Sequence, residues 1–378
     1  MLEFGPDLST PPVACSDPEW ALLTQGLGQR MRLLDAIAGW VYGRPASARE
    51  GILPSALTLG HGAYLPMLEG VQPLGGRHLS LMTFDVACDH QGHWWVLGQN
   101  SRAALPQPGE PPAGLQYWLR HWQHLGPGTP NEAPHWVVLL PPGASDLASW
   151  ASPWSPWGIS AARATDLLVR HHDLFLQTPQ GLRVVHGLIN LQGHDTLDPL
   201  EQACPVDQGI AGLFDVLRHA RVQVLNAPGL VFLDSPAWLG FLPVLCQQIL
   251  GEDLLLPSIT SWWCGEPEVW SQALRKGLDH GFIPTYPDDG LRPTFAPQSI
   301  DGLSDVQLSA WAHRIRRHPE HYTVQKRWSG TPSLRVLTLL GPQMTHSSPL
   351  EHPAWSMSLG PGLAPVWSAQ PSTRFKGI

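Results

Sequence analysis

Lysine is scarce in this chain of 378 residues, which contains only Lys276, Lys326 and Lys376. Because a compact ammonium group is the usual point charge on nucleotide phosphates, few side chains here are suited to that task. Charged residues of all kinds make up only 14% of the chain, against roughly 25% in ordinary soluble domains. The formal net charge of −8 argues against nucleic acid or another phosphate surface as a partner, since these need a basic protein face.

Long apolar runs and export signals are also missing. No stretch approaches the 18 or so apolar residues of a transmembrane helix, and the first residues show neither the basic nor the apolar region of a secretory signal. The five cysteines include no C-x-x-C pair and follow no regular spacing, which is typical of reduced thiols in a cytosolic protein. The sequence therefore predicts a cytoplasmic protein with no membrane association.

The residues that are abundant indicate a globular protein with many turns. Apolar residues make up 43% of the chain, which is enough for a sizeable core, and the length suits two or three domains. Proline and glycine, 39 and 37 residues, predict many turns and irregular segments. The 18 tryptophans are best explained as large rings that fill the core and its interfaces.

Hydrophobic patterning predicts both helices and strands. A helix is expected after Ser16, which can cap it together with Glu19, and a second after Ser235, with Pro236 in its first turn. Two strands are expected on either side of the turn at residues 90–92. From Trp136 onward, buried strand patterns alternate with helical ones, as in a Rossmann-like layer. No G-x-G-x-x-G is present, so dinucleotide binding gains no support.

The last third of the chain shows three further patterns. A helix capped at Ser304 and two strands, "TVQKRW" and "LRVLTLL", are expected there. Before them, "DHGFIPTYPDDGLRPTF" at residues 279–295 is typical of a hairpin. The tail beyond Gly341 has little periodicity and is rich in Pro, Ser and Gly, so no element is predicted in it.

Three local groups of polar residues are candidate sites. Cys88, His90 and His93 form C-x-H-x-x-H in a turn, but no fourth zinc ligand lies nearby in the sequence. The stretch "GHDTLDP", with Asp195 and Asp198, follows a buried strand, which is where α/β proteins bind ligands, although such residues are equally common in turns. The histidine pairs in "RHHD" and "RRHPEHY" are interpreted as solvated or packing residues. No G-x-S-x-G, P-loop or HExxH motif occurs.

Several stretches, in a fixed order, resemble the circularly permuted type 2 ATP-grasp family. They include "EWALLTQGLGQRMRLLDAI", "FDVACDHQGHWWVLGQN", "GIAGLFDVLRHARVQVLNAPG" and "ILGEDLLLPSITSWWCGEP", and they run from about Pro12 to Arg335. The resemblance implies an α/β fold in which circularly permuted α+β ATP-grasp subdomains are joined to a Rossmann-like central domain. It implies three parts: residues 1–132 with a metal-strand hairpin, the Rossmann-like residues 133–265, and the remaining ATP-grasp subdomain at 266–378.

The resemblance also implies a chemistry. ATP-grasp enzymes activate a carboxylate as an acyl phosphate, which an amine attacks to form an amide, and this needs ATP and Mg²⁺ held by carboxylates and cations. The family's metal strand ends Glu-Asp-Asn with an arginine two residues later. Here Gly98 and Gln99 replace the two carboxylates, while Asn100 and Arg102 remain. Asp85 is kept at the position of another metal ligand, so Asp85 and Asn100 are the candidate metal ligands and Arg102 a candidate ATP contact.

Other family positions are altered in the phosphate-binding hairpin and beyond it. Ile283 stands where the phosphate-binding lysine belongs, and Asp289 replaces a loop glycine. Gln325 is kept as a candidate ATP contact, and Arg335 matches a family arginine that would be catalytic. Asp195 is what remains of a strand end that carries paired arginines in the family and would also contact the cofactor. Lys326 follows Gln325 where a Glu is usual, and Pro365 stands in place of an arginine.

These changes gather on nucleotide, metal and phosphoryl contacts, while packing motifs persist, and three interpretations remain open. The first is a degenerate, non-catalytic member, a pseudoenzyme without a cofactor, that acts as a binding or regulatory subunit. Its partner would be an active ATP-grasp paralogue or another protein encoded in the same operon. The second is an active carboxylate–amine ligase, dependent on ATP and Mg²⁺, with a rearranged site. The third is a structural or metal-binding role that uses the group at Cys88.

Overall fold

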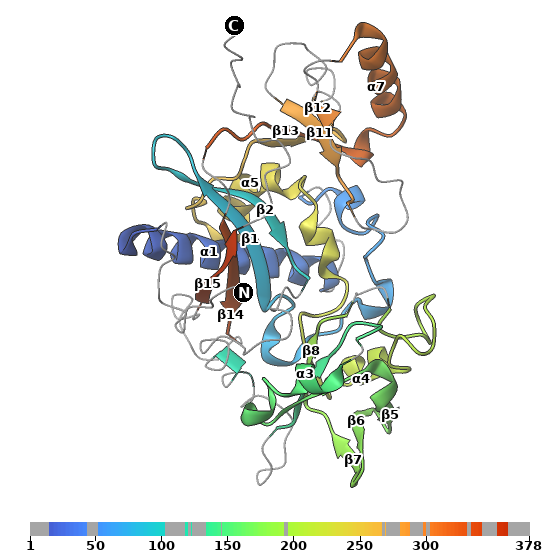
Figure 1. Ribbon diagram of the computed structural model, residues 1–378. Helices are drawn as coiled ribbons and strands as arrows, with labels where there is room; N and C mark the ends of the chain where they lie inside the picture. Colours follow the sequence, from blue (N-terminus) through green and yellow to red (C-terminus); the bar gives the residue numbers. More distant parts are fainter. Residues whose placement is uncertain are drawn as a thin grey trace, which may run out of the picture.

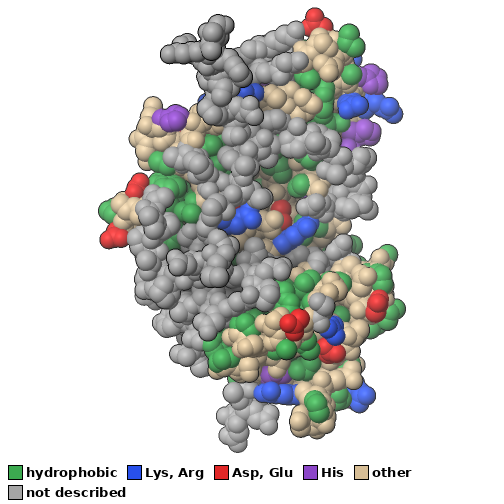
Figure 2. Space-filling view, viewed as in Figure 1, with side chains coloured by type: hydrophobic (Ala, Val, Ile, Leu, Met, Phe, Trp, Pro, Cys, Tyr) green, Lys and Arg blue, Asp and Glu red, His purple; other side chains and the backbone are tan. Residues whose placement is uncertain are grey.

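The computed structural model describes most of the chain: residues 15–43, 52–102, 118–119, 122, 134–144, 146–192, 196–266, 269, 280–287, 298–299, 303–330 and 334–341, and the backbone of 354–361. The fold is mixed α/β with several sheets, arranged along one long axis (Figure 1), and the space-filling view from the same side has the same elongated outline (Figure 2). The described strands are β1 Leu81–Cys88, β2 Trp94–Asn100, β3 Trp136–Leu139, β4 Ile159–Ala162, β5 Leu167–Arg170, β6 Asp173–Thr178, β7 Gly181–Val184, β8 Gly187–Asn190, β9 Gln223–Leu225, β10 Ser261–Trp263, β11 His280–Pro284, β12 Gln298–Ser299, β13 Tyr322–Lys326, β14 Leu334–Leu340 and β15 Ala354–Pro361.

The helices differ widely in length. The α-helices are α1 Asp17–Tyr42, α3 Leu147–Ala151, α4 Leu213–Arg218, α5 Trp238–Leu250 and α7 Asp305–Arg317. Short 3₁₀ helices lie between them: η2 Ser55–Leu57, η3 Pro66–Leu68, η4 Leu74–Gly76, η5 Ser155–Trp157, η6 Ala164–Asp166, η7 Leu230–Asp234 and η8 Pro319–His321. Within the described ranges, none of these helices is long and apolar enough to cross a membrane.

The middle of the molecule is an antiparallel sheet with strand order β15-β14-β1-β2, and it contacts α1 (Figure 1). The predicted helix start is confirmed, since the N–H of Ser16 donates to the Glu19 carboxylate at 2.8 Å and α1 begins at the next residue. Leu23, Leu27 and Met31 on α1 are fully buried, as its apolar face predicts. Because β14 and β15 come from the C-terminal third of the chain, this sheet joins the two ends of the described sequence.

A parallel sheet with order β4-β3-β8-β9 forms the lower part of the molecule, next to a small antiparallel sheet β5-β6-β7 (Figure 1). All four residues of β3 are buried, as predicted from the continuous apolar run after His135. A fourth sheet, β10-β13-β11-β12, lies with α7 in the upper part. The cap of α7 is also confirmed, because the Ser304 hydroxyl accepts the N–H of Gln307.

Two predictions about elements are wrong. The helix expected from Ser235 begins at Trp238, with Ala237 as its N-cap, because η7 occupies the preceding residues and buries Ser235 at its end. The Ser235 hydroxyl accepts the N–H of Ala237 at 3.3 Å instead of capping the helix. The tail beyond Gly341, for which no element was predicted, contributes β15, which pairs with β14. Of the hairpin predicted at residues 279–295, residues 279 and 288–295 lie outside the described residues. Its first strand is β11, which pairs antiparallel with β12 just beyond the predicted hairpin.

Asn226 connects the parallel sheet to the antiparallel sheet in the middle of the molecule. It follows β9, is 1% exposed, and its Oδ1 accepts the N–H groups of Ser80 and Leu81 at 2.7 and 2.9 Å. Its Nδ2 donates to the carbonyls of Leu81 and Ser101, each at 2.7 Å. The starts of β1 and of the segment after β2 are therefore fixed by one fully bonded side chain.

Candidate active site

Asp85 and Arg335 form an ion pair at the centre of the β15-β14-β1-β2 sheet. They are directly opposite each other in the register of β1 and β14. The Arg335 guanidinium donates from Nε to Oδ1 of Asp85 at 3.0 Å and from its NH2 group to Oδ2 at 2.9 Å. Both side chains are mostly buried, with 26% of the Arg335 side chain and 16% of the Asp85 side chain exposed. This bidentate geometry is the strong form of an arginine–carboxylate contact.

Gly98 lies next to Asp85 on the neighbouring strand. The two residues are opposite each other in the register of β1 and β2, and a Cβ added at Gly98 would lie 3.8 Å from Oδ2 of Asp85. The face that carries the Asp85 carboxylate is therefore the face on which the family's replaced glutamate would project. Glycine leaves Asp85 as the carboxylate at this point of the sheet.

Asn100 and Arg102 come at the end of the same strand. Asn100 is opposite Thr83, two residues from Asp85 on β1, so its side chain projects from the same sheet face as that carboxylate. Its Oδ1 accepts the N–H of Arg102 at 2.8 Å, and both residues are exposed. The structure thus places Asp85, Asn100 and Arg335 on one face, with Arg102 just beyond it.

Gln99, the second substituted carboxylate position, points to the opposite side. It is 9% exposed, and its Nε2 donates to the carbonyl of Leu233 at 2.7 Å. Its Oε1 is buried and has no hydrogen-bond partner among the described residues. The amide therefore holds β2 against η7, a role that a charged carboxylate could not take without cost.

Ile283 and Gln325 lie in a different sheet, β10-β13-β11-β12. Ile283 is 4% exposed and is opposite Thr323, which is fully buried. Gln325, two residues further along β13, shares that face and donates from Nε2 to the Ser261 hydroxyl at 3.2 Å. The opposite face is covered by α7, where Phe282 stacks on Trp311 with ring centroids 5.6 Å apart. The position predicted to correspond to the family lysine is thus a buried isoleucine.

Two sequence candidates fall outside the described residues, and a third has a different role from the one considered. Asp195 and Asp289 are not among the residues that the structure describes. Asp198, considered as a ligand in the loop after β8, is fully buried. Its carboxylate accepts the N–H groups of Leu200, Gly212 and Phe214 at 3.0, 3.0 and 2.9 Å. It fixes the start of α4 and is not presented to a ligand.

The group at Cys88 is a tight turn. Oδ1 of Asp89 accepts the N–H groups of Gln91 and His93 at 2.8 and 2.9 Å, and its Oδ2 accepts the indole N–H of Trp95 at 2.9 Å. These hydrogen bonds, first those from the backbone of His93, lower the pKa of Asp89 to about 2. Burial raises the pKa of the Cys88 thiol, which disfavours the thiolate that zinc requires. The turn is explained by its own hydrogen bonds.

Comparison with known proteins gives the family. The model of the circularly permuted ATP-grasp type 2 family matches residues 12–121 and 109–344. An uncharacterized protein of Synechocystis is 24% identical over 88% of this chain and 72% of its own length. Two uncharacterized proteins of Mycobacterium tuberculosis are 23% and 26% identical over 87% and 88% of this chain, which spans 62% and 40% of their lengths. The chain belongs to the circularly permuted type 2 ATP-grasp family, whose members generally use ATP and Mg²⁺.

Proposed function

We propose that this chain is a non-catalytic member of its family, which has lost nucleotide binding and acts as a binding or regulatory subunit. The observation that carries the proposal is the Asp85–Arg335 ion pair. Both carboxylate oxygens accept hydrogen bonds from the guanidinium, so Mg²⁺ would have to displace a charged partner to reach them. The unit negative charge of Asp85 is already balanced, and Gly98 adds no second carboxylate to attract a dication.

The phosphate side of the site supports the same proposal. Ile283, at the lysine position, is buried in β11 at 4% exposure and has no charge to offer a phosphoryl group. Gln325 donates an amide hydrogen to the Ser261 hydroxyl within the sheet. A polyphosphate would meet no ammonium group at Ile283 and no open metal ligand at Asp85. The protein would then act by binding a partner through its surface and not by binding ATP.

The domain layout and partner belong to the same proposal. We infer divisions at residues 1–132, 133–265 and 266–378, with the parallel sheet of β4, β3, β8 and β9 as a Rossmann-like central domain. The partner would be an active ATP-grasp paralogue or another protein encoded in the same operon.

A second candidate function is an active ATP- and Mg²⁺-dependent carboxylate–amine ligase with a rearranged site. The shared sheet face of Asp85, Asn100 and Arg335 favours it. In such an enzyme, Arg335 would turn from Asp85 to the phosphoryl group, freeing the carboxylate to bind Mg²⁺ beside Asn100, and Arg102 would bind phosphate. The buried Ile283 argues against this candidate, because it carries no charge that could bind phosphate.

ATP turnover separates the two functions. The purified chain would be incubated with ATP, Mg²⁺ and mixtures of amino acids and short peptides as carboxylate and amine donors, and ADP release would be followed by a coupled assay. The non-catalytic account predicts the same ADP background for the chain and for its Asp85→Ala variant. ADP release above that background, abolished in Asp85→Ala, would establish the ligase instead.

A further inference from the structure

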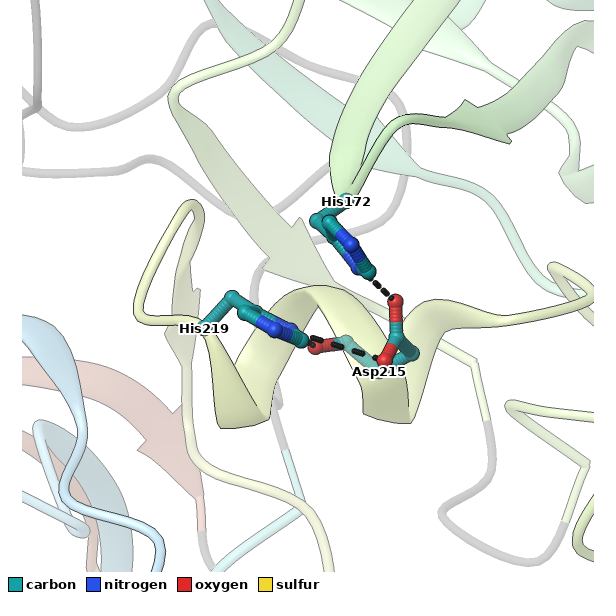
Figure 3. A group of neighbouring side chains, drawn as sticks. All are labelled: His172, Asp215 and His219. Atoms are coloured by element: carbon teal, nitrogen blue, oxygen red, sulfur yellow. Dashed lines mark hydrogen bonds and ion pairs between the residues drawn. The ribbon is translucent and has the colours of Figure 1, made fainter.

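Three metal-binding side chains meet where the β5–β6 hairpin contacts α4, away from the family's nucleotide site. His172 lies in the hairpin turn, Asp215 lies on α4, and His219 is its C-cap (Figure 3). Asp215 and His219 are four residues apart, so the helix places them on one face. In Figure 3 the two imidazoles, one from the hairpin and one from the end of α4, both point toward Asp215.

The distances within this group are short. Nδ1 of His172 lies 2.6 Å from Oδ2 of Asp215. Nδ1 of His219 lies 2.9 Å from the main-chain carbonyl oxygen of Asp215 and 3.5 Å from its Oδ1. The two imidazole rings are stacked, with centroids 3.9 Å apart and an interplanar angle of 29°. One ligand atom from each of the three residues lies within 4.8 Å of the other two.

The hairpin is fixed in the position that brings His172 to the helix. Arg221, just after α4, donates from Nε to the Asp173 carboxylate at 2.8 Å, one residue beyond His172. Both turn residues, His171 and His172, have positive φ values of 50° and 66°, a conformation that asparagine and glycine adopt most easily in two-residue hairpins. A histidine therefore occupies a position where the backbone favours other residues.

We propose that His172, Asp215 and His219 bind a late first-row divalent cation, with Zn²⁺ as the representative ion. Imidazole nitrogen and carboxylate oxygen bind zinc at about 2.0–2.2 Å, which puts neighbouring ligand atoms of a tetrahedral site about 3.4 Å apart. The ligand atoms now lie within 4.8 Å of one another and would have to move closer to reach that spacing. Three protein ligands leave the fourth position to water. Two imidazoles select such an ion over Mg²⁺, which prefers an all-oxygen site.

The bound ion would tie two elements together. His172 belongs to the β5-β6-β7 sheet, and the other two ligands belong to the α4 region, so the ion would cross-link them across the hairpin. All three side chains are about half exposed, which gives the ion direct access from solvent. The site is independent of Asp85 and of any nucleotide, and it stands whether or not the chain is an active ligase.

A second group, His318, Glu320 and His321, supplies a matched control. Its two imidazoles lie 3.4 Å from the same carboxylate oxygen, and their ring centroids are 4.9 Å apart. These residues sit within one turn after α7, and His321 also packs edge-on against Tyr286. A single substitution there, His318→Gln, removes a histidine of similar exposure without touching the proposed site.

The test is calorimetric titration of the whole chain with ZnCl₂ at slightly alkaline pH. The variants are His172→Asn, which suits the left-handed turn, His219→Gln, and the control His318→Gln. The expected result is saturable binding that weakens at least about tenfold in both site variants and is unchanged in the control. Absence of binding in the unaltered chain, or equal affinity in His172→Asn and the unaltered chain, would overturn the proposal.

Cobalt(II) in place of zinc identifies the ligand type. Histidine and carboxylate ligation predicts a spectrum without a sulfur-to-metal charge-transfer band, and the d–d bands should disappear in His219→Gln. A strong charge-transfer band that persists in both site variants would assign the ion to one of the five free thiols and contradict the proposed site.

Discussion

At the scale of single residues, the defining feature of the site is the Arg335 guanidinium, which donates hydrogen bonds to both oxygens of the Asp85 carboxylate. Asp85 and Arg335 are 250 positions apart in the sequence, and the family resemblance predicts each of them separately as a site residue. What the sequence does not reveal is that they satisfy each other. Their pairing depends on the register between β1 and β14, which only the folded sheet fixes.

The strength of this pair is measurable by a double-mutant cycle. Asp85→Asn and Arg335→Gln, alone and combined, are expected to show a coupling free energy of about 1–2 kcal/mol, because the contact is bidentate and mostly buried. The free energy of unfolding in urea would be compared among the four proteins. Additive effects would mean that the two side chains are not paired in solution and that Asp85 is open to a metal.

The residue at the lysine position gives a second prediction at this scale. Ile283→Lys is expected to lower the free energy of unfolding by about 2–4 kcal/mol, since it buries an ammonium beside Thr323. The control Ile283→Val should cost only about 0.5–1.5 kcal/mol. Urea unfolding followed by tryptophan fluorescence would measure both. If lysine is tolerated as well as valine, the position opens onto solvent or a cleft, as the ligase account requires.

At the scale of elements, local sequence predicted most helices and strands, because caps and alternation are local signals. The capped starts of α1 and α7, the strands β1 and β2, and the buried strand β3 follow from such patterns. The start of α5 was misjudged because a buried 3₁₀ turn took the residues before it. Asp198 was considered as a ligand because a carboxylate that caps a helix from a preceding loop has the same local sequence as one that binds a ligand.

The role of Asp198 can be tested through α4. Asp198→Ala removes the acceptor for three backbone N–H groups in a fully buried position and is expected to cost about 2–3 kcal/mol of unfolding free energy. Hydrogen exchange should rise in α4 first. Asp146→Ala is the control, because Asp146 caps α3 at an exposed position and its loss should cost only about 0.5–1 kcal/mol. Equal costs would show that the loop after β8 does not depend on Asp198.

At the scale of the whole molecule, the pairing of distant segments was beyond the sequence. β15 lies in a stretch without clear periodicity and is ordered by its partner β14. Asn226 looks like an ordinary turn residue in "VLNAPG", yet it joins the two sheets through four hydrogen bonds. Such contacts arise only when segments more than a hundred residues apart meet.

Global stability should depend on pH through a buried histidine. Burial lowers the pKa of His135 from 6.5 to about 4, and its Nε2 lies 2.9 Å from the Ser160 hydroxyl. Below pH 6.5 the unfolded chain binds a proton that the folded chain does not, so the free energy of unfolding should fall as pH drops from 6.5 to about 4. Burial also lowers the pKa of His78, which adds an effect of the same sign.

Urea unfolding at a series of pH values would measure this dependence. His135→Gln should flatten the curve in that window, whereas His90→Gln, at an exposed position, should leave its slope unchanged. An equally steep curve for His135→Gln would assign the pH dependence to other groups.

The measurement that tests the central claim most directly is calorimetric titration of the chain with ATP in millimolar Mg²⁺, with Asp85→Ala as the control. The non-catalytic account predicts no binding heat and no thermal stabilisation in either protein, because Arg335 neutralises Asp85 and Ile283 replaces the phosphate-binding cation. Saturable ATP binding that is lost in Asp85→Ala would contradict this account and support the alternative proposal of an active ATP-dependent ligase.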